Sequence, residues 1–326
     1  MTSLDRLVEG LFDYAGLFPP AALEFDDALK TSAGASQRLK RPGIVGADFV
    51  LGFDRLHELT PERLLERGFP KAKTVRLAVL GPTVDTPDPI EHARQIEAIQ
   101  SFNEAHASDL IRQRVVSYEV KLDLNGFENR ENARVALDRV RRELGAQTVR
   151  LYIEPDWDEG AWEDRWDWFW ETLDSLNAAP EHPSVCPKVR GSGPTAITVE
   201  RLARFITAVN QRSLPFKATA GLHHPIVEKD LYGNTLGFLS LATALRLQRR
   251  LGPEAFPESV IASCLRESSV ENFGFEDGLS WKNFKMTMEE LRDAVLSHPF
   301  GIGSCSVDDP DADLTRLLPS IEPVGA

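Results

Sequence analysis

Short runs of apolar and β-branched residues alternate along the chain with longer stretches in which apolar residues recur at helical spacing. The runs are almost continuously apolar, which is typical of parallel strands covered on both faces. Repeated strand–helix units of this kind predict an α/β fold built on a parallel sheet. Seven runs predict strands, at residues 44–53, 74–81, 114–124, 148–155, 184–190, 214–221 and 300–307.

Three of the intervening stretches carry helix start signals. Thr60 precedes Pro61, and Asp88 precedes Pro89, so that each pair reads as an N-cap followed by proline in the first turn. Asn129 or Asn132 opens the third helix, and Gly145 follows its end.

An eighth strand is expected either at 11–18 or at 259–266. Eight strands favour a TIM-type (β/α)8 barrel over an open doubly wound sheet. No Gly-x-Gly-x-x-Gly turn follows an early strand, and the main sign of a dinucleotide-binding domain is therefore missing.

The length of 326 residues suits a single barrel domain over 1–326. More than 70 residues separate the seventh and last strand runs, where one strand–helix unit takes about 30. We therefore expect 226–298 to be a helical insertion on the seventh βα connection. Such insertions at the carboxyl ends of barrel strands often cover or complete the active site.

The chain is acidic, with a net charge of -13 and a pI near 5.1, and this argues against a nucleic-acid surface. No run approaches 18 uninterrupted apolar residues, and the start lacks a signal peptide, so we expect a cytoplasmic protein without a membrane span. The three cysteines, Cys186, Cys264 and Cys305, have no metal-binding spacing and are expected to be buried thiols.

Five of the six tryptophans lie between Glu154 and Leu176. Trp162, Trp166 and Trp170 share one helix face. This face is expected to pack inside the protein. Any exposed part of it would indicate a subunit interface in a homo-oligomer, because tryptophan is enriched at interfaces.

Lys188 and Lys217 each close an apolar run, and this makes them the leading candidates for chemistry. Loss of hydration lowers the pKa of a buried ammonium group, and a second ammonium group nearby lowers it further. A neutral amine attacks a carbonyl carbon to form a Schiff base. One strand–helix step separates the two lysines, so neighbouring parallel strands are expected to bring both into one pocket.

Other polar residues lie where the predicted strands end, which is where barrels carry their active groups. Glu154 follows an otherwise apolar strand and suits a general acid or base, a lysine partner or a metal ligand. Arg190 has the geometry to hold a substrate carboxylate or phosphate, or equally to pair with Glu154. Strand ends and the small-residue turns after them add further candidates, namely Glu119, Asp123, Gly191, Ser192, Gly303, Ser304 and Ser306.

His223 and His224 follow Lys217 in a Gly-Leu-His-His-Pro turn. Either histidine suits a proton shuttle or substrate donor, or a metal ligand together with Glu154 or Glu119. No His-Glu-x-x-His, P-loop or Gly-x-Ser-x-Gly motif is present. The favoured interpretation uses neither a metal nor another cofactor.

The order of short motifs resembles deoxyribose-phosphate aldolase and related lysine-dependent class I aldolases. The stretches that carry the resemblance are DYAGLFPPA from Asp13, TVRLYIE ending at Glu154, KVRGSG from Lys188, KATAG from Lys217 and IGSCS from Ile302. The chain also resembles a set of bacterial proteins that share the DYAGLFPPA, FKATAGLHHP and GSCS elements.

This resemblance implies that Lys188 is the Schiff-base lysine and that Lys217 lowers its pKa and relays protons. Asp123 or Glu119 would stand near the proton-relay aspartate. Gly303, Ser304 and Ser306 would form a phosphate-binding turn. The sequence departs from the family pattern at Arg190 and Gly191, where small hydroxyl residues are usual.

The sequence therefore predicts a Schiff-base-forming lyase or aldolase that acts on a small anionic carbonyl metabolite. Two alternatives stay open at this point. One is a metal-dependent barrel lyase or isomerase, with Lys188 as its base. The other is a barrel without catalysis that binds a small metabolite or a partner protein.

Overall fold

The computed structural model describes residues 1–145, 149–156, 159–179, 181–193, 195–230, 233–234 and 236–321. Its chain divides into two compact units. The first unit comprises Met1–Tyr14, Gly34–Gly46 and Val189–Ala326. The second comprises Ala15–Ala33 and Ala47–Lys188. A single barrel domain over the whole chain stays a prediction.

Eight strands close into a barrel in the order β1-β13-β7-β6-β5-β4-β3-β2, which confirms the TIM-type α/β fold. The region 11–18 supplies the eighth strand as β1, whereas 259–266 forms helix α9 (Glu258–Leu265). The barrel strands are β1 (Phe12–Tyr14), β2 (Val45–Gly52), β3 (Thr74–Leu80), β4 (Arg112–Leu122), β5 (Arg150–Pro155), β6 (Val185–Arg190), β7 (Phe216–Thr219) and β13 (Phe300–Ser304).

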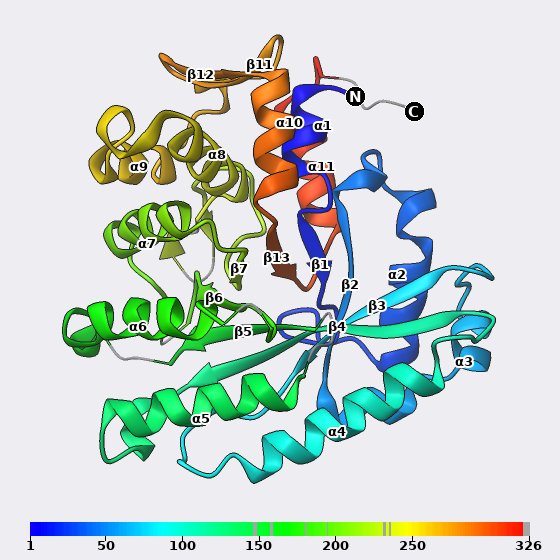
Figure 1. The fold of residues 1–326 in the computed structure, drawn as a ribbon. Helices are drawn as coiled ribbons and strands as arrows, with labels where there is room; N and C mark the ends of the chain where they lie inside the picture. The colour runs from blue at the N-terminus through cyan, green and yellow to red at the C-terminus, as the bar shows by residue number, and fades with distance from the viewer. Residues whose placement is uncertain are drawn as a thin grey trace. The chain divides into compact units, whose positions relative to one another are not determined.

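In the second unit, parallel ladders join β2 to β3, β3 to β4, β4 to β5, and β5 to β6. Helices α4 (Ile90–Ala105), α5 (Arg130–Glu143) and α6 (Trp162–Asn177) follow β3, β4 and β5. In Figure 1, α4 and α5 run side by side along this part of the sheet. The register places Lys121 opposite Glu154, so the carboxyl ends of β4 and β5 are level.

The capping predictions are largely confirmed. The side chain of Thr60 accepts a hydrogen bond at the start of α3 (Pro61–Glu66), and Asn129 caps α5 in the same way. The prediction for Asp88 was wrong, because α4 begins after Pro89 without a side-chain cap. The carboxylate of Asp88 instead pairs with Arg139 of α5 at 2.7 Å.

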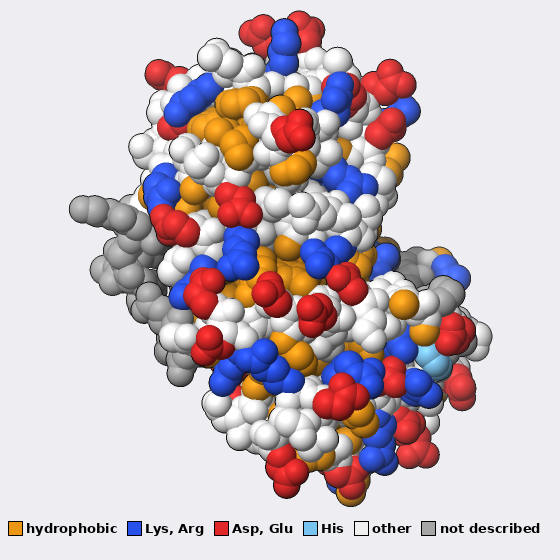
Figure 2. All heavy atoms as spheres, turned by 60° about the vertical axis from the view of Figure 1, so that its left-hand side comes forward, with side chains coloured by type: hydrophobic (Ala, Val, Ile, Leu, Met, Phe, Trp, Pro, Cys, Tyr) orange, Lys and Arg blue, Asp and Glu red, His pale blue; other side chains and the backbone are white. Residues whose placement is uncertain are grey.

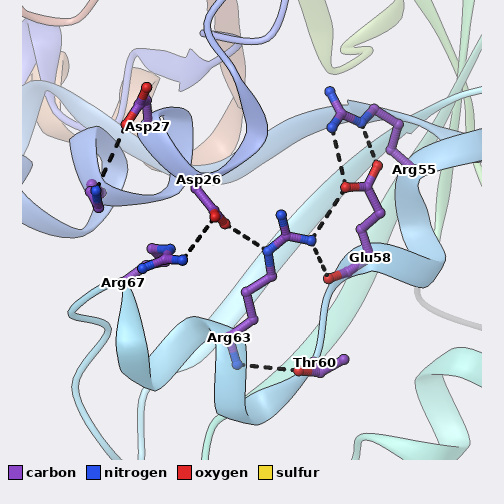
Figure 3. A network of polar contacts seen from close by, with 8 residues as sticks. Asp26, Asp27, Arg55, Glu58, Thr60, Arg63 and Arg67 are labelled. Carbon is purple, nitrogen blue, oxygen red and sulfur yellow. Dashed lines mark hydrogen bonds and ion pairs between the residues drawn. The ribbon is translucent and has the colours of Figure 1, made fainter.

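A network of ion pairs fixes the start of α2 (Phe25–Arg38) against η2 (Phe53–Glu58) and α3 (Figure 3). Asp26 accepts hydrogen bonds from Arg67 at 2.8 Å and from Arg63 at 2.7 Å, and these two bonds lower its pKa to about 2. Arg63 also reaches Glu58, whose other partner is Arg55. Three elements are thereby joined through charged groups at the surface.

In the first unit, β13 pairs with both β1 and β7, and all pairings are parallel. Asp13 lies opposite Gly303, and Lys217 lies opposite Gly301. Helices α7 (Val199–Arg212), α8 (Phe238–Ala255) and α9 pack on one another, as Figure 1 shows. Helix α1 (Ser3–Val8) lies beside α10 (Met288–Ser297), and α11 (Asp308–Leu317) follows β13.

The segment 226–298 lies between β7 and β13 and contains the expected helices α8, α9 and α10. It also contains strands that the pattern did not predict. Two are short, β8 (Lys229–Asp230) and β9 (Gly233–Asn234). The other three form an antiparallel sheet of β10 (Phe273–Gly274), β11 (Gly278–Trp281) and β12 (Phe284–Thr287).

The tryptophan face of α6 is buried. Trp162, Trp166 and Trp170 expose 3%, 7% and 3% of their surface, so this face packs inside the second unit as expected. It offers almost no area to a partner. A homo-oligomer therefore stays a prediction without support from these side chains. Trp157 lies outside the described residues.

Charged side chains of both signs are interspersed on the face drawn in Figure 2. Among the described residues, no helix has the length and apolar character needed to cross a membrane. Cys186, Cys264 and Cys305 are buried, as predicted.

Candidate functional site

Three neighbouring strands of the second unit bring Lys188, Glu119 and Glu154 together. The Nζ atom of Lys188 lies 3.0 Å from Oε2 of Glu119 and 3.2 Å from Oε2 of Glu154. All three side chains are buried, with 4% of each glutamate side chain and 9% of the lysine side chain exposed. The cluster is therefore one ammonium group held between two carboxylates in a largely dry environment.

Strand register explains how the cluster forms. Glu119 of β4 pairs with Tyr152, two residues before Glu154 on β5. Because alternate residues of a strand share a face, Glu119 and Glu154 project to the same side of the sheet. Ser117, two residues before Glu119, donates a hydrogen bond to Oε1 of Glu119 at 3.4 Å.

The pKa of Lys188 is raised, contrary to the expectation from the sequence. Burial alone lowers this pKa, but the negative charges of Glu119 and Glu154 and their hydrogen bonds outweigh burial. Lys188 is consequently an ammonium ion at neutral pH. A nucleophilic amine forms here only when the proton moves to an acceptor, and a carboxylate lies within hydrogen-bonding distance.

The first unit holds a second buried pair of the same kind. Nζ of Lys217 on β7 lies 2.7 Å from Oδ2 of Asp13 on β1, and each side chain is 8% exposed. Glycines make room for Asp13. A Cβ atom at Gly46 would lie 2.7 Å from Oδ1 of Asp13, and one at Gly301 would lie 3.3 Å from Oδ2. The sequence had marked Asp13 only as the first residue of a motif.

The pocket expected to contain both lysines stays a prediction. Lys188 belongs to the second unit, and Lys217 belongs to the first. Each lysine has a buried carboxylate partner within its own unit.

The turn after β13 uses its hydroxyl groups internally. Ser304 donates to the carbonyl oxygen of Ser306 at 2.5 Å and lies 3.4 Å from Nδ1 of His223. Ser306 accepts a hydrogen bond from the Asp309 amide at 3.2 Å, in the first turn of α11. That turn also carries Asp308 and Asp311. Its three aspartates do not favour a bound phosphate, although Gly303, Ser304 and Ser306 were predicted to bind one.

The turn after β6 is closely packed. The amide of Gly191 donates to the Thr219 carbonyl at 2.8 Å, and a Cβ atom at Gly191 would lie 2.7 Å from the oxygen of Ala220. Ser192 lies against Gly221, and Arg190 is half-buried at the end of β6. Binding of a substrate anion by Arg190, Gly191 and Ser192 stays a prediction, and Pro194 lies outside the described residues.

Asp123 has a structural contact at the end of β4. Its Oδ1 atom accepts a hydrogen bond from the Asn125 amide at 2.9 Å and so caps η3 (Leu124–Gly126). Of the two carboxylates proposed from this strand, Glu119 is the one that the structure joins to Lys188.

His224 lies among acidic residues of the first unit. Its Nδ1 atom is 2.7 Å from Oδ2 of Asp313 and 3.7 Å from Oε2 of Glu228. From the sequence, Glu119 or Glu154 was the expected partner of this histidine at a metal ion. Nothing in the sequence pattern pointed to Asp313, which is 89 residues away from His224.

Known proteins resemble this chain in fold alone. No family model and no curated protein matches the chain. A D-psicose 3-epimerase from Clostridium cellulolyticum H10 matches over 92% of this chain and 89% of its own, with 9% identity and a TM-score of 0.41. A proposed alpha-galactosidase from Bacteroides fragilis NCTC 9343 matches over 83% of this chain and 66% of its own, with 9% identity and a TM-score of 0.42.

A second proposed alpha-galactosidase or melibiase from the same organism has 12% identity and a TM-score of 0.37. The match covers 63% of this chain and spans 44% of the length of that protein. TM-scores at this level carry no argument about chemistry.

Proposed function

We propose that the protein is a lyase of the aldolase type, in which Lys188 forms a Schiff base with a small carbonyl substrate. The observation that carries the proposal is the pair of buried carboxylates at 3.0 Å and 3.2 Å from Nζ of Lys188. Schiff-base formation needs a group that takes a proton from the ammonium ion and a group that returns one to the carbonyl oxygen. Two glutamates beside one lysine supply both.

The reaction begins when a carboxylate accepts a proton from Lys188. The amine then adds to the carbonyl carbon, and the carbonyl oxygen becomes a hydroxyl group by taking up a proton. Loss of this hydroxyl group as water, with a proton from a glutamic acid, leaves an iminium ion. The carbon–nitrogen double bond replaces the carbon–oxygen double bond, and no oxidant or reductant is needed.

The iminium ion draws electrons from the bond between its α and β carbons. A carboxylate removes the proton from a hydroxyl group on the far carbon, which leaves as an aldehyde, and the remaining fragment becomes an enamine. Protonation of the enamine and hydrolysis of the iminium ion release the second product and restore Lys188. In this scheme Glu119 and Glu154 exchange protons with the substrate throughout.

The charge of the cluster bears on the substrate. One ammonium ion and two carboxylates sum to one negative charge, so a substrate phosphate or carboxylate would bind away from Glu119 and Glu154. Arg190, which follows Lys188 by two residues, stays the proposed partner for that end of the substrate.

Reductive trapping tests the proposal. The protein is incubated with a panel of small aldehydes, ketoses and keto acids, reduced with borohydride and mapped by peptide mass spectrometry. We expect an adduct on Lys188 with at least one compound and none in Lys188→Met. Lys121→Met is the matched control, because Lys121 lies two residues after Glu119 on β4 and pairs with Asp156 at 3.2 Å.

Two results would overturn the proposal. One is the absence of an adduct on Lys188 across the whole panel. The other is equal modification of Lys188 and Lys121, which would indicate unselective chemistry. Turnover of a carbonyl substrate that survives in Lys188→Met would show that Lys188 is neither the Schiff-base lysine nor the base of the metal-dependent alternative.

A further inference from the structure

Three donor atoms from separate parts of the first unit converge beside α11. They are Nδ1 of His224, a carboxylate oxygen of Glu228 and a carboxylate oxygen of Asp313, and all lie within 4.8 Å of one another. His224 and Glu228 belong to the segment after β7, and Asp313 lies on α11. The side chains are partly buried, with exposed fractions of 28%, 32% and 16%.

The separations between these atoms suit a first-row divalent metal ion. Bonds from such an ion to imidazole nitrogen and carboxylate oxygen are about 2.0–2.2 Å, so ligand atoms on one ion lie about 3.0–3.4 Å apart. The observed separations from Nδ1 are 2.7 Å to Oδ2 of Asp313 and 3.7 Å to Oε2 of Glu228. Small rotations of the side chains bring both into the range for binding.

Arg316 orients the two carboxylates. Its Nη2 atom lies 2.8 Å from Oδ1 of Asp313 and 3.3 Å from Oε1 of Glu228. In each carboxylate, the oxygen nearest His224 is the other one. Partners of this kind, which hold a ligand by its second atom, are a common feature of metal sites.

The backbone that carries His224 and Glu228 is fixed before any ion binds. The carbonyl oxygens of His224 and Pro225 accept hydrogen bonds from Phe238 and Leu239 at the start of α8, both at 2.9 Å. The Val227 amide, next to Glu228, donates to the Glu267 carbonyl at 3.1 Å. Gly237 permits the close approach, since a Cβ atom there would lie 2.5 Å from the Pro225 oxygen.

We propose that His224, Glu228 and Asp313 bind a divalent transition-metal ion such as Zn²⁺, Co²⁺ or Mn²⁺, with Arg316 as the residue that positions the two carboxylates. One imidazole and two carboxylates form a mixed nitrogen and oxygen set that suits these ions better than Mg²⁺ or a thiolate-loving ion. Three protein ligands leave coordination positions for water or a small anion.

Calorimetric titration with Zn²⁺, Co²⁺, Mn²⁺ and Mg²⁺ tests this proposal on the full chain at pH 7.5, after treatment with a chelator. We expect about one tightly bound transition-metal ion per chain and a much weaker response to Mg²⁺. His224→Ala and Glu228→Gln should each weaken binding by at least about tenfold. The Co²⁺ absorption spectrum gives a second measurement, because d–d bands report nitrogen and oxygen coordination directly.

His106→Ala is the matched control. His106 also has its Nδ1 atom beside an aspartate, Asp109 at 2.5 Å, but this pair is not part of the three-residue group. Its substitution should leave metal affinity unchanged. Arg316→Gln removes the group that orients both carboxylates, and we expect metal affinity to fall by about tenfold.

The proposal fails if none of the three transition-metal ions binds more tightly than about 100 μM, or if binding is the same in wild type, His224→Ala and Glu228→Gln. Glu228→Gln keeps the shape of a partly exposed side chain, so loss of folding does not obscure the result. These outcomes are separate from trapping at Lys188, which uses none of the four residues.

Discussion

At the scale of single residues, the protonation state of Lys188 decides how the proposed chemistry starts. Its pKa is raised because Glu119 and Glu154 outweigh burial, so the resting side chain is a poor nucleophile near neutral pH. Glu154→Gln removes one negative charge and should lower this pKa. We expect labelling of Lys188 by an amine-selective reagent at pH 8 to increase measurably, because a lower pKa enlarges the neutral fraction of the amine.

The same substitution should slow turnover, because the glutamine neither accepts nor returns a proton. Greater reactivity with lower activity would separate the effect on the amine from the role in proton transfer. Labelling of Lys121 in the same samples is the internal reference. Unchanged labelling of Lys188 in both Glu119→Gln and Glu154→Gln would contradict the electrostatic argument.

The residues of the site were only partly predictable. Lys188, Glu119 and Glu154 were found because each is a polar residue near the end of an apolar strand, and parallel strands end together. The direction of the Lys188 pKa shift was not predicted. Burial of a lysine can be inferred from its own segment of the sequence, but the charges beside it depend on the register between strands. Asp313 and Glu228 were missed because their closeness to His224 arises only from folding.

At the scale of elements, a buried arginine caps the C-terminal end of α6. Arg141 of α5, with 3% of its side chain exposed, donates to the carbonyl oxygens of Leu176 and Ala179 and pairs with Asp138 at 2.8 Å. The last carbonyls of a helix have no partner within the helix, so a cation here satisfies both hydrogen bonding and the helix dipole. Arg141→Met should therefore lower the free energy of unfolding by about 2–4 kcal/mol.

The adjacent Arg142 provides the control. It pairs with the same aspartate at 2.8 Å, but 64% of its side chain is exposed. Arg142→Met should change the free energy of unfolding by less than about 0.5 kcal/mol. Guanidinium chloride titrations followed by circular dichroism compare the two variants, and equal midpoints would show that burial of Arg141 adds nothing.

Helices and strands were predicted correctly where the hydrophobic pattern extends over many residues, and were missed where the segment is short. Strand β1 has three residues, and β10 has two, so neither carries a clear alternation. The run 259–266 is apolar enough for a strand, yet it follows Pro257 and becomes α9. The β11–β12 hairpin had a usable signal, because Leu279, Trp281, Phe284 and Met286 alternate around the turn at Lys282 and Asn283.

At the scale of the whole molecule, the strand–helix alternation was sufficient to predict the closed barrel, because parallel strands covered by helices leave few arrangements. The division into units was not foreseen, since no change of composition marks residues 46 or 188. The dependence of stability on pH is also a property of the whole molecule, because protonation acts on every carboxylate and histidine together.

Stability should fall in two stages as the pH decreases. Burial, followed by the charges of Arg249 and Arg246, lowers the pKa of His298 to about 4. The unfolded chain takes up this proton near pH 6.5, so the folded state loses stability between about pH 6.5 and 4. Asp26, with a pKa of about 2, contributes stability above about pH 4 that is lost as the pH falls toward 2.

We expect the melting temperature to drop by on the order of 5 °C between pH 7 and pH 4.5, and more steeply below that range. His298→Gln should flatten the first stage and leave the second, whereas the exposed His57→Gln should change neither. Melting followed by near-ultraviolet circular dichroism at low protein concentration avoids precipitation near the pI of about 5.1. A first stage that persists unchanged in His298→Gln would mean that other groups cause it, such as His92, whose pKa is also lowered by burial.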